Sequence, residues 1–224
     1  NNNKQEGGSC HLFCILLQSI FKILYIWQNS SFNMESLVVI NACMREESRT
    51  QKILDGLLGV LGKKYNIEII DLSTLNISWI GEKDLKDRDN GYVPEEFVSM
   101  SKKVANADRL VIAAPFCFLC FPSVLKVFFE NISLFNITFT STQTECVGLC
   151  KAKKVLYITT RGMNIKTGDP LEQATPYIKA LSKLWGLGEL YVVSAQNMDY
   201  SSQNEIDCKI ETAIAQGLEL CKSF

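Results

Sequence analysis

The chain has 224 residues, of which 47% are hydrophobic, and its formal net charge is −1 at pH 7. This length and apolar content are enough for one substantial core, so a single domain is expected. The nearly neutral charge provides no extended basic surface, which excludes electrostatic binding of nucleic acid or of an anionic membrane. Nine cysteines at irregular spacings, several of them within apolar runs, favour buried reduced thiols and a cytoplasmic protein over a secreted disulfide framework.

The first 33 residues differ in character from the rest of the chain. Residues 1–5 are polar, whereas residues 11–27 are mostly apolar with Lys22 among them. The segment lacks the small-residue cleavage site of a signal peptide, and it is too short and too charged for a membrane helix. Because Met34 directly precedes the first strand, we interpret residues 1–33 as an upstream, non-native extension, with a peripheral anchor as the alternative. The folded domain is then expected at residues 34–224.

From Met34 onward, short apolar runs alternate with segments of helical periodicity. Strands are expected at residues 36–41, 67–72, 109–114, 154–159 and 189–195, and helices at 50–61, 94–106, 123–133, 171–185 and 203–222. Residues 73–92, which contain a charge run from Glu82 to Asp89, are interpreted as a solvated loop, and residues 138–147 as a small hairpin. Five strands separated by helices predict a parallel sheet with helices on both faces. Right-handed crossovers favour the strand order 2-1-3-4-5.

The loop between the first strand and its helix is a candidate anion site. Ser48, Arg49 and Thr50 lie where the helix begins, so free backbone N–H groups, two hydroxyls and a guanidinium are expected near one point. Ser and Thr are also common N-cap residues, so an ordinary helix start explains the same residues equally well. The sequence has no GxxxxGK[ST] and no GxGxxG, which excludes a P-loop and a dinucleotide fingerprint.

The loop after the third strand is the most unusual segment. Residues 115–122 hold three phenylalanines, a leucine and two cysteines between two prolines. One interpretation is an apolar bed for a planar ring. A second is a redox pair, because Cys117 and Cys120 form a C-x-x-C between a strand and a helix. A third is a zinc site completed by the loosely spaced Cys146 and Cys150. Apolar packing of the Cys117 and Cys120 thiols is the simplest interpretation and is compatible with a ring site, so no metal is assigned.

A third suitable loop follows the fourth strand, where Thr160, Arg161 and Gly162 offer a hydroxyl, a guanidinium and a backbone that a ring can approach closely. Because the carboxyl ends of parallel strands meet at one crevice, the three loops predict a shared ligand. The single histidine is His11, so the sequence offers no Ser/His/Asp or Cys/His arrangement. We therefore assign no catalytic side chain and expect a cofactor to carry the chemistry.

Several short motifs follow one another in a fixed order from Met34 to the C-terminus. They are Leu37–Cys43 with Ser48–Thr50, Ala107–Pro115, Phe121–Lys126, Ile137–Phe139, Gly148–Lys154 and Thr159–Gly162. In this order they resemble the FMN-dependent NADH:azoreductase and NAD(P)H dehydrogenase (quinone) branch of the flavodoxin-like superfamily. The resemblance implies an α/β flavodoxin-like three-layer sandwich. It also implies an FMN-dependent oxidoreductase that moves hydride from NADH or NADPH to quinone or azo acceptors by a ping-pong mechanism, usually as a homodimer.

The same resemblance assigns the cofactor contacts. The residues at the start of the first helix are expected to hold the FMN phosphate, those after the third strand to line the isoalloxazine ring, and those after the fourth strand to lie beside its pyrimidine edge. The complete predicted cofactor-binding set is Cys43, Ser48, Arg49, Thr50, Pro115, Phe116, Cys117, Phe118, Leu119, Thr160, Arg161 and Gly162.

The sequence departs from the family pattern at two places. Cys117 and Phe118 stand where an aromatic and a polar residue are usual, and Met163 stands where a second glycine is usual. Both changes remove polar or flexible contacts to a ring. Two alternatives therefore stay open: a non-enzymatic flavodoxin-like electron carrier, against which the small net charge argues, and a homologue that has lost flavin binding.

Overall fold

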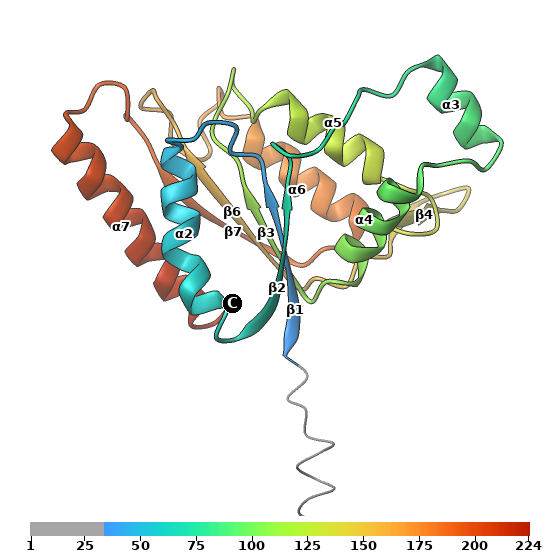
Figure 1. The fold of residues 1–224 in the computed structure, drawn as a ribbon, viewed down its shortest axis with the longest axis horizontal. Helices are drawn as coiled ribbons and strands as arrows, with labels where there is room; N and C mark the ends of the chain where they lie inside the picture. The colour runs from blue at the N-terminus through green and yellow to red at the C-terminus, as the bar shows by residue number, and fades with distance from the viewer. Residues whose placement is uncertain (1–33) are drawn as a thin grey trace, which may run out of the picture. The chain divides into compact units, whose positions relative to one another are not determined.

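The computed structural model describes residues 34–224, and residues 35–224 form one compact unit. The interpretation of residues 1–33 as an extension falls outside the described residues. Five parallel strands form the central sheet: β1 (Glu35–Asn41), β2 (Tyr65–Asp71), β3 (Arg109–Ala113), β6 (Lys154–Thr160) and β7 (Glu189–Ala195). Their spatial order is β2-β1-β3-β6-β7, which is the predicted order 2-1-3-4-5 (Figure 1).

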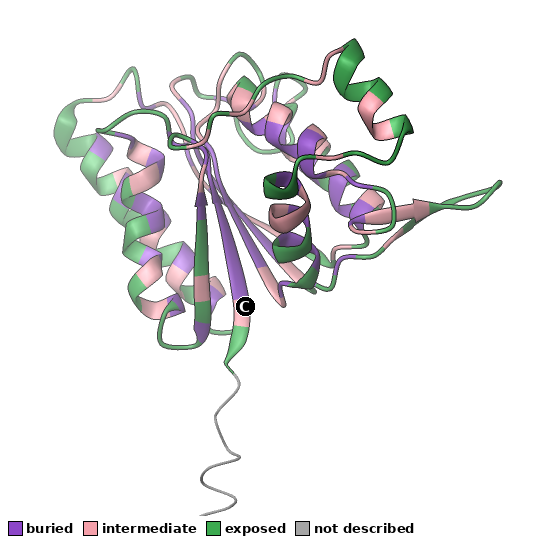
Figure 2. Ribbon diagram, turned by 45° about the vertical axis from the view of Figure 1, so that its right-hand side comes forward, coloured by how far each residue is buried: buried purple, intermediate pink, exposed green. Residues whose placement is uncertain are grey.

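Helices cover both faces of the sheet. The helices α2 (Arg49–Leu61) and α7 (Gln203–Cys221) pack on one face, and α4 (Glu95–Asn106), α5 (Ser123–Ile132) and α6 (Ala174–Trp185) pack on the other. The alternation of side chains along each strand builds two cores, as in β1, where Val38 and Ile40 join the α4–α6 side. Leu37 and Val39 join the α2 and α7 side. The three inner strands β1, β3 and β6 are accordingly the most buried elements (Figure 2), and the predicted three-layer sandwich is confirmed.

The polar insertion contains a helix that the sequence analysis interpreted as loop. Helix α3 (Glu82–Asp89) has no buried residue, so no apolar stripe marks it in the sequence. Its charged residues stabilise the helix in place of apolar burial. Acidic residues lie in its first turn and basic residues in its last turn, where they complement the helix dipole. Lys86 and Glu82 form an i,i+4 ion pair of 2.7 Å between Nζ and Oε1. The loop prediction for this part of residues 73–92 was wrong, whereas the predicted hairpin is present as β4 (Phe139–Ser141) and β5 (Cys146–Gly148).

The strand register brings the carboxyl ends of the sheet together. Asn41 pairs with Ala113, and Ala113 pairs with Ile158, so β1, β3 and β6 end nearly level. Thr160 pairs with Ala195 at the end of β7. The loops that follow these four strands therefore leave the sheet at one edge. Among the helices of residues 34–224, none combines the length and the apolar character needed to cross a bilayer.

Candidate functional site

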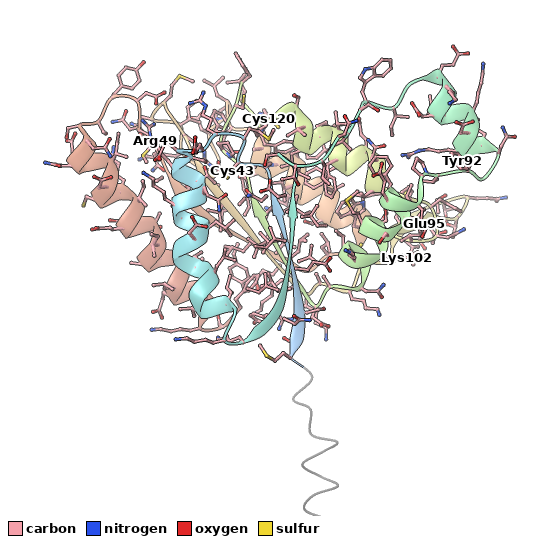
Figure 3. All side chains as sticks on the ribbon, in the orientation of Figure 1. Cys43, Arg49, Tyr92, Glu95, Lys102 and Cys120 are labelled. Atoms are coloured by element: carbon pink, nitrogen blue, oxygen red, sulfur yellow. The ribbon has the colours of Figure 1, made fainter. Side chains whose placement is uncertain are left out.

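A cavity of about 540 Å³ opens at the carboxyl edge of the sheet. Its lining comes from the loops after β1, β3, β6 and β7 and consists of Met44, Arg45, Glu47, Ser48, Arg49, Pro115, Phe116, Cys117, Pro122, Thr160, Gly162 and Asp199. Figure 3 shows Arg49 at this edge, at the start of α2, and Cys120 in the segment that leads into α5. The volume lies within the range of small-molecule and cofactor sites, which is roughly 300–1,000 Å³.

One wall of the cavity is the start of α2. Ser48 is the N-cap residue, and its Oγ accepts a hydrogen bond of 3.3 Å from the backbone N–H of Gln51. The first backbone N–H groups of a helix have no helical acceptor, and the dipole makes this end positive. Arg49 adds a guanidinium, whose Nη1 donates to Oδ1 of Asp199 at 2.9 Å. This wall is polar and suited to an anion that could replace Asp199 as the partner of Arg49.

The opposite wall is the segment after β3, which is mainly apolar and turns sharply. Cys117 and Cys120 pair as antiparallel bridge partners, with each backbone N–H donating to the other's carbonyl at 2.9 Å. The two residues between them both have left-handed backbone angles, with φ 43° at Phe118 and φ 69° at Leu119. Positive φ at both central positions is the requirement of a type I′ hairpin turn, which usually takes Asn or Gly. The side chain of Phe118 is consequently carried into solvent and is 97% exposed.

The floor between the two walls is made by the end of β6. Thr160 Oγ1 lies 2.8 Å from Thr50 Oγ1, and both residues are buried, so this contact ties the end of β6 to the first turn of α2. Gly162 follows, and a Cβ there would lie 1.9 Å from Oδ2 of Asp199. The backbone N–H of Asp199 donates to the Gly162 carbonyl at 3.0 Å. Only glycine fits this approach without displacing the residue that pairs with Arg49.

Arg161 lies beneath the cavity rather than in its lining. It is fully buried, and its Nη1 donates to the Ile165 carbonyl at 3.0 Å while its Nη2 donates to Thr167 Oγ1 at 2.9 Å. Its guanidinium carbon lies 5.8 Å from the ring centroid of Phe116, a cation–π contact behind the apolar wall. Burial lowers the pKa of Arg161, and Glu172, also fully buried with Oε1 3.9 Å from Nη2, opposes that shift. Arg161 therefore supports Phe116 and the loop after β6.

Cys43 is also set back from the cavity. It is buried against the end of β3, with its Sγ 3.9 Å from the Ala113 carbonyl. Burial raises the pKa of its thiol to about 11. The thiol is thus neutral and shielded, and Cys43 serves as packing under the loop.

The structure divides the predicted set of site residues into two groups. The residues in the cavity lining are Ser48, Arg49, Pro115, Phe116, Cys117, Thr160 and Gly162. The residues outside the lining are Cys43, Thr50, Phe118, Leu119 and Arg161. Two of the latter, Phe118 and Leu119, are exposed on the hairpin turn beside Cys117, whereas the other three are buried behind the lining.

Five lining residues are absent from the predicted set: Met44, Arg45, Glu47, Pro122 and Asp199. The first four lie within or next to the predicted loops after the first and third strands. Their position at the carboxyl end of a strand was the signal that could have identified them. Asp199 follows β7, whose loop leaves the same edge, and the same topological rule would have included it.

The zinc interpretation finds no support within residues 34–224, where no three His, Cys, Asp or Glu side chains gather as a metal site. Cys146 is exposed on β5, and Cys150 is buried with a thiol pKa raised by burial to about 12. Within the same residues every cysteine is a free thiol.

Bacterial proteins resemble the chain in sequence over most of its length. One named FMN-dependent NADH:quinone oxidoreductase from Clostridium beijerinckii is 32% identical over 195 residues, covering 82% of this chain and 96% of that protein. Another of the same name from Clostridium perfringens is 29% identical over 201 residues, covering 85% of this chain and all of that protein. The resemblance thus extends over nearly the whole of each relative.

Solved structures share the fold at lower identity. An azoreductase from Bacillus anthracis superposes with a TM-score of 0.73 at 18% identity and covers 85% of this chain and 100% of its own. An FMN-dependent NADH-azoreductase from the same species, determined in complex with FMN, gives a TM-score of 0.69 at 23% identity, covering 84% of this chain and 100% of its own. A family profile described as flavodoxin-like fold matches residues 35–217. The predicted resemblance is confirmed, and the chain belongs to this flavodoxin-like family together with the FMN-dependent NADH:quinone oxidoreductases.

Proposed function

We propose that this protein is an FMN-dependent oxidoreductase that takes hydride from NADH and delivers it to quinone or azo acceptors by a ping-pong mechanism. The observation that carries the proposal is the cavity itself. It joins a positive helix start at Arg49, an apolar wall at Phe116 and a glycine floor at Gly162. Relatives that match more than four-fifths of this chain are named FMN-dependent NADH:quinone oxidoreductases. NADH rather than NADPH is proposed as the donor because those names specify it.

The polar wall fits the phosphate of FMN. The backbone N–H groups at the start of α2 and the guanidinium of Arg49 point to an anion, and Arg49 is only half-buried, so a ligand can reach it. Ser48 already accepts from Gln51 as the helix cap, so its hydroxyl hydrogen is the part available to a ligand. A phosphate in this position competes with Asp199 for Arg49, and its two negative charges favour it in that competition.

The apolar wall fits a planar ring. Pro115, Phe116 and Cys117 line this wall and have apolar side chains, and Gly162 on the floor has no side chain to obstruct a ring. Bound FMN supplies the acceptance and release of hydride. The chain's own side chains then need only to bind, orient and shield the ring.

The rim of the cavity carries exposed apolar side chains that suit a planar acceptor. Met44 lines the cavity, Phe118 and Leu119 lie on the adjoining turn, and Met163 follows Gly162; all four side chains are exposed. We further propose a homodimer in which a second copy covers this rim, a point that size-exclusion chromatography with light scattering will test. A cytoplasmic location is proposed from the free thiols of the described residues.

The first experiment is a visible spectrum of purified protein with added FMN, followed by anaerobic NADH and, in parallel, NADPH. The proposal predicts flavin bands near about 375 and 450 nm that bleach on addition of NADH and return when a quinone is added. Bound flavin that NADH does not bleach would indicate an electron carrier instead. A protein that never binds FMN would overturn the cofactor assignment.

A further inference from the structure

The two cysteines of the hairpin after β3 lie directly opposite each other on paired backbone. They are directly opposed bridge partners joined by two backbone hydrogen bonds, and residues in such a pair have Cα atoms about 5.5 Å apart with side chains on the same face. That separation falls inside the window of roughly 4.4–6.8 Å in which disulfides form. Both side chains are intermediate in exposure and both are free thiols. The two thiols can therefore meet after a local adjustment of the turn that brings their Cβ atoms closer.

The surroundings of the two thiols differ. Cys117 lines the cavity, so a small molecule that enters the cavity can reach its sulfur. Cys120 packs at the edge of the core on the α4–α6 side, and burial raises the pKa of its thiol. Glu172 acts in the same direction. Cys117 is thus the accessible thiol and Cys120 the sheltered one.

We propose that Cys117 and Cys120 are a redox-active dithiol that reacts with low-molecular-weight disulfides and closes the turn with an intramolecular disulfide. The Cys117 thiolate attacks one sulfur of the disulfide RSSR, and RS⁻ leaves and takes up a proton. The Cys120 thiolate then attacks Cys117 in the mixed disulfide and expels the second RS⁻. In total, the protein dithiol loses two electrons and two protons and becomes a disulfide, and RSSR gains them and becomes two RSH. The reaction requires no flavin, so it can be tested whether or not the proposed function is right, although Cys117 lies on the wall that we assign to the flavin ring.

The bond would act as a labile redox element rather than as a structural staple. A turn with only two residues between the cysteines restricts the unfolded chain very little, so its disulfide contributes little conformational stabilisation. The left-handed angles of Phe118 and Leu119 already store strain in this turn. Strained and accessible disulfides are the readily reduced ones. The position of Cys117 in the lining also means that its redox state changes the wall of the cavity.

The test is a thiol-trapping experiment on the full chain. Reduced protein is equilibrated with oxidised glutathione, quenched in acid, alkylated and digested with trypsin. Cleavage after Arg109 and Lys126 releases residues 110–126, a peptide in which Cys117 and Cys120 are the only cysteines. The expected result is that neither cysteine is alkylated and that the peptide is two hydrogens lighter than its reduced, unalkylated form. After reduction with dithiothreitol, both cysteines should again be alkylated. Full alkylation of both thiols after equilibration with oxidised glutathione would overturn the proposal.

Single variants test the order of attack. Cys120→Ser is expected to trap glutathione on Cys117, because no second thiol can expel it. Cys117→Ser is expected to accumulate several-fold less mixed disulfide on the sheltered Cys120. Equal trapping in the two variants would contradict the roles assigned to the two thiols. Cys208→Ser is the matched control: it removes an exposed thiol on α7 and leaves the oxidation of the 110–126 peptide unchanged.

Discussion

The two walls of the cavity are built by opposite means. The wall at the start of α2 uses ordinary helix geometry, with Ser48 as an N-cap and Arg49 in the first turn. The wall after β3 uses a turn that its residues do not favour, because Phe118 and Leu119 both adopt left-handed angles. The first wall is polar and unstrained, whereas the second is apolar and strained.

The contrast indicates which wall carries which task. A phosphate needs donors whose positions are fixed, and the N-terminus of a helix provides them at no conformational cost. Strain persists only where the surrounding structure over-determines it, and it gathers at sites that bind or react. The strained turn is held by its own two hydrogen bonds and by the Gln173 N–H, which donates to the Leu119 carbonyl at 2.8 Å. We therefore expect the α2 wall to govern cofactor affinity and the turn to govern which acceptors enter.

The largest expected effect is on the polar wall. Replacing Ser48 and Arg49 together with Ala should weaken FMN binding by about 2–4 kcal/mol, because hydrogen bonds to charged groups are the strong ones. Flavin fluorescence titration or calorimetry measures the change. The matched control is Lys52→Ala, which removes one positive charge from the same helix outside the cavity lining, where Lys52 pairs with Glu47 at 3.3 Å. Unchanged affinity in the double variant, or an equal loss in the control, would remove the phosphate assignment.

The join between the polar wall and the floor should give the next largest effect. Thr50→Val keeps the shape of the side chain but leaves the buried Thr160 hydroxyl without its partner, which costs about 1–3 kcal/mol of unfolding free energy. Urea denaturation measures it. Thr50→Ser keeps the hydroxyl and is the control. Removing both hydroxyls, in Thr50→Val with Thr160→Val, should restore most of the stability, because no buried hydroxyl is then left without a partner. If Thr50→Val alone is no less stable than Thr50→Ser, the contact contributes nothing to stability.

The buried thiol of Cys43, which packs beneath the loop after β1, should make the stability of the fold fall in alkali. Because burial raises the pKa of Cys43 from 9.0 to about 11, the native state keeps this proton at pH values where the unfolded chain has lost it. The stabilisation is complete below pH 9 and disappears as the pH rises toward 11, amounting to a loss of about 1 kcal/mol between roughly pH 8 and pH 10. Cys150, whose thiol pKa burial raises from 9.0 to about 12, adds a loss that begins at the same pH and continues to higher pH.

Unfolding free energies measured across this range will check the alkaline loss. Cys43→Ala should make the fall of unfolding free energy with pH less steep, because the variant lacks this buried thiol. This holds even if the substitution lowers the stability at every pH. Cys208→Ala, which removes an exposed thiol from α7, is the matched control. An identical slope in wild type and Cys43→Ala would show that Cys43 does not titrate differently on unfolding.

The sequence predicted the fold well because its signals are regular. Parallel strands buried on both faces read as continuous apolar runs, as in β1 and β3, and the handedness of crossovers then restricts the strand order. Helix α3 was missed because no residue of it is buried, so only its charges could reveal it.

The site was predicted less completely. Topology places a loop at the cavity but does not say which of its side chains face inward. The left-handed turn exposes Phe118 and Leu119 on the rim, and the ion network of Arg161 draws that residue beneath the floor. Neither outcome has a local sequence signal, because both depend on contacts made across the fold.

The smallest expected effect is on the strained turn. Two variants of Phe118 distinguish the cost of strain to stability from the role of the ring in acceptor binding. Phe118→Gly should raise the unfolding free energy of the single subunit by about 0.5–1 kcal/mol, since glycine adopts φ 43° freely and the ring buries almost nothing within its own subunit. Phe118→Ala is the matched control, because it removes the ring but keeps the Cβ that causes the strain. If the ring guides acceptors, both variants should raise KM for a quinone severalfold, whereas only the glycine variant should gain stability. Equal stability of the two variants would mean that the turn stores no strain at Phe118, and an unchanged KM in both would assign acceptor selection to other residues of the rim.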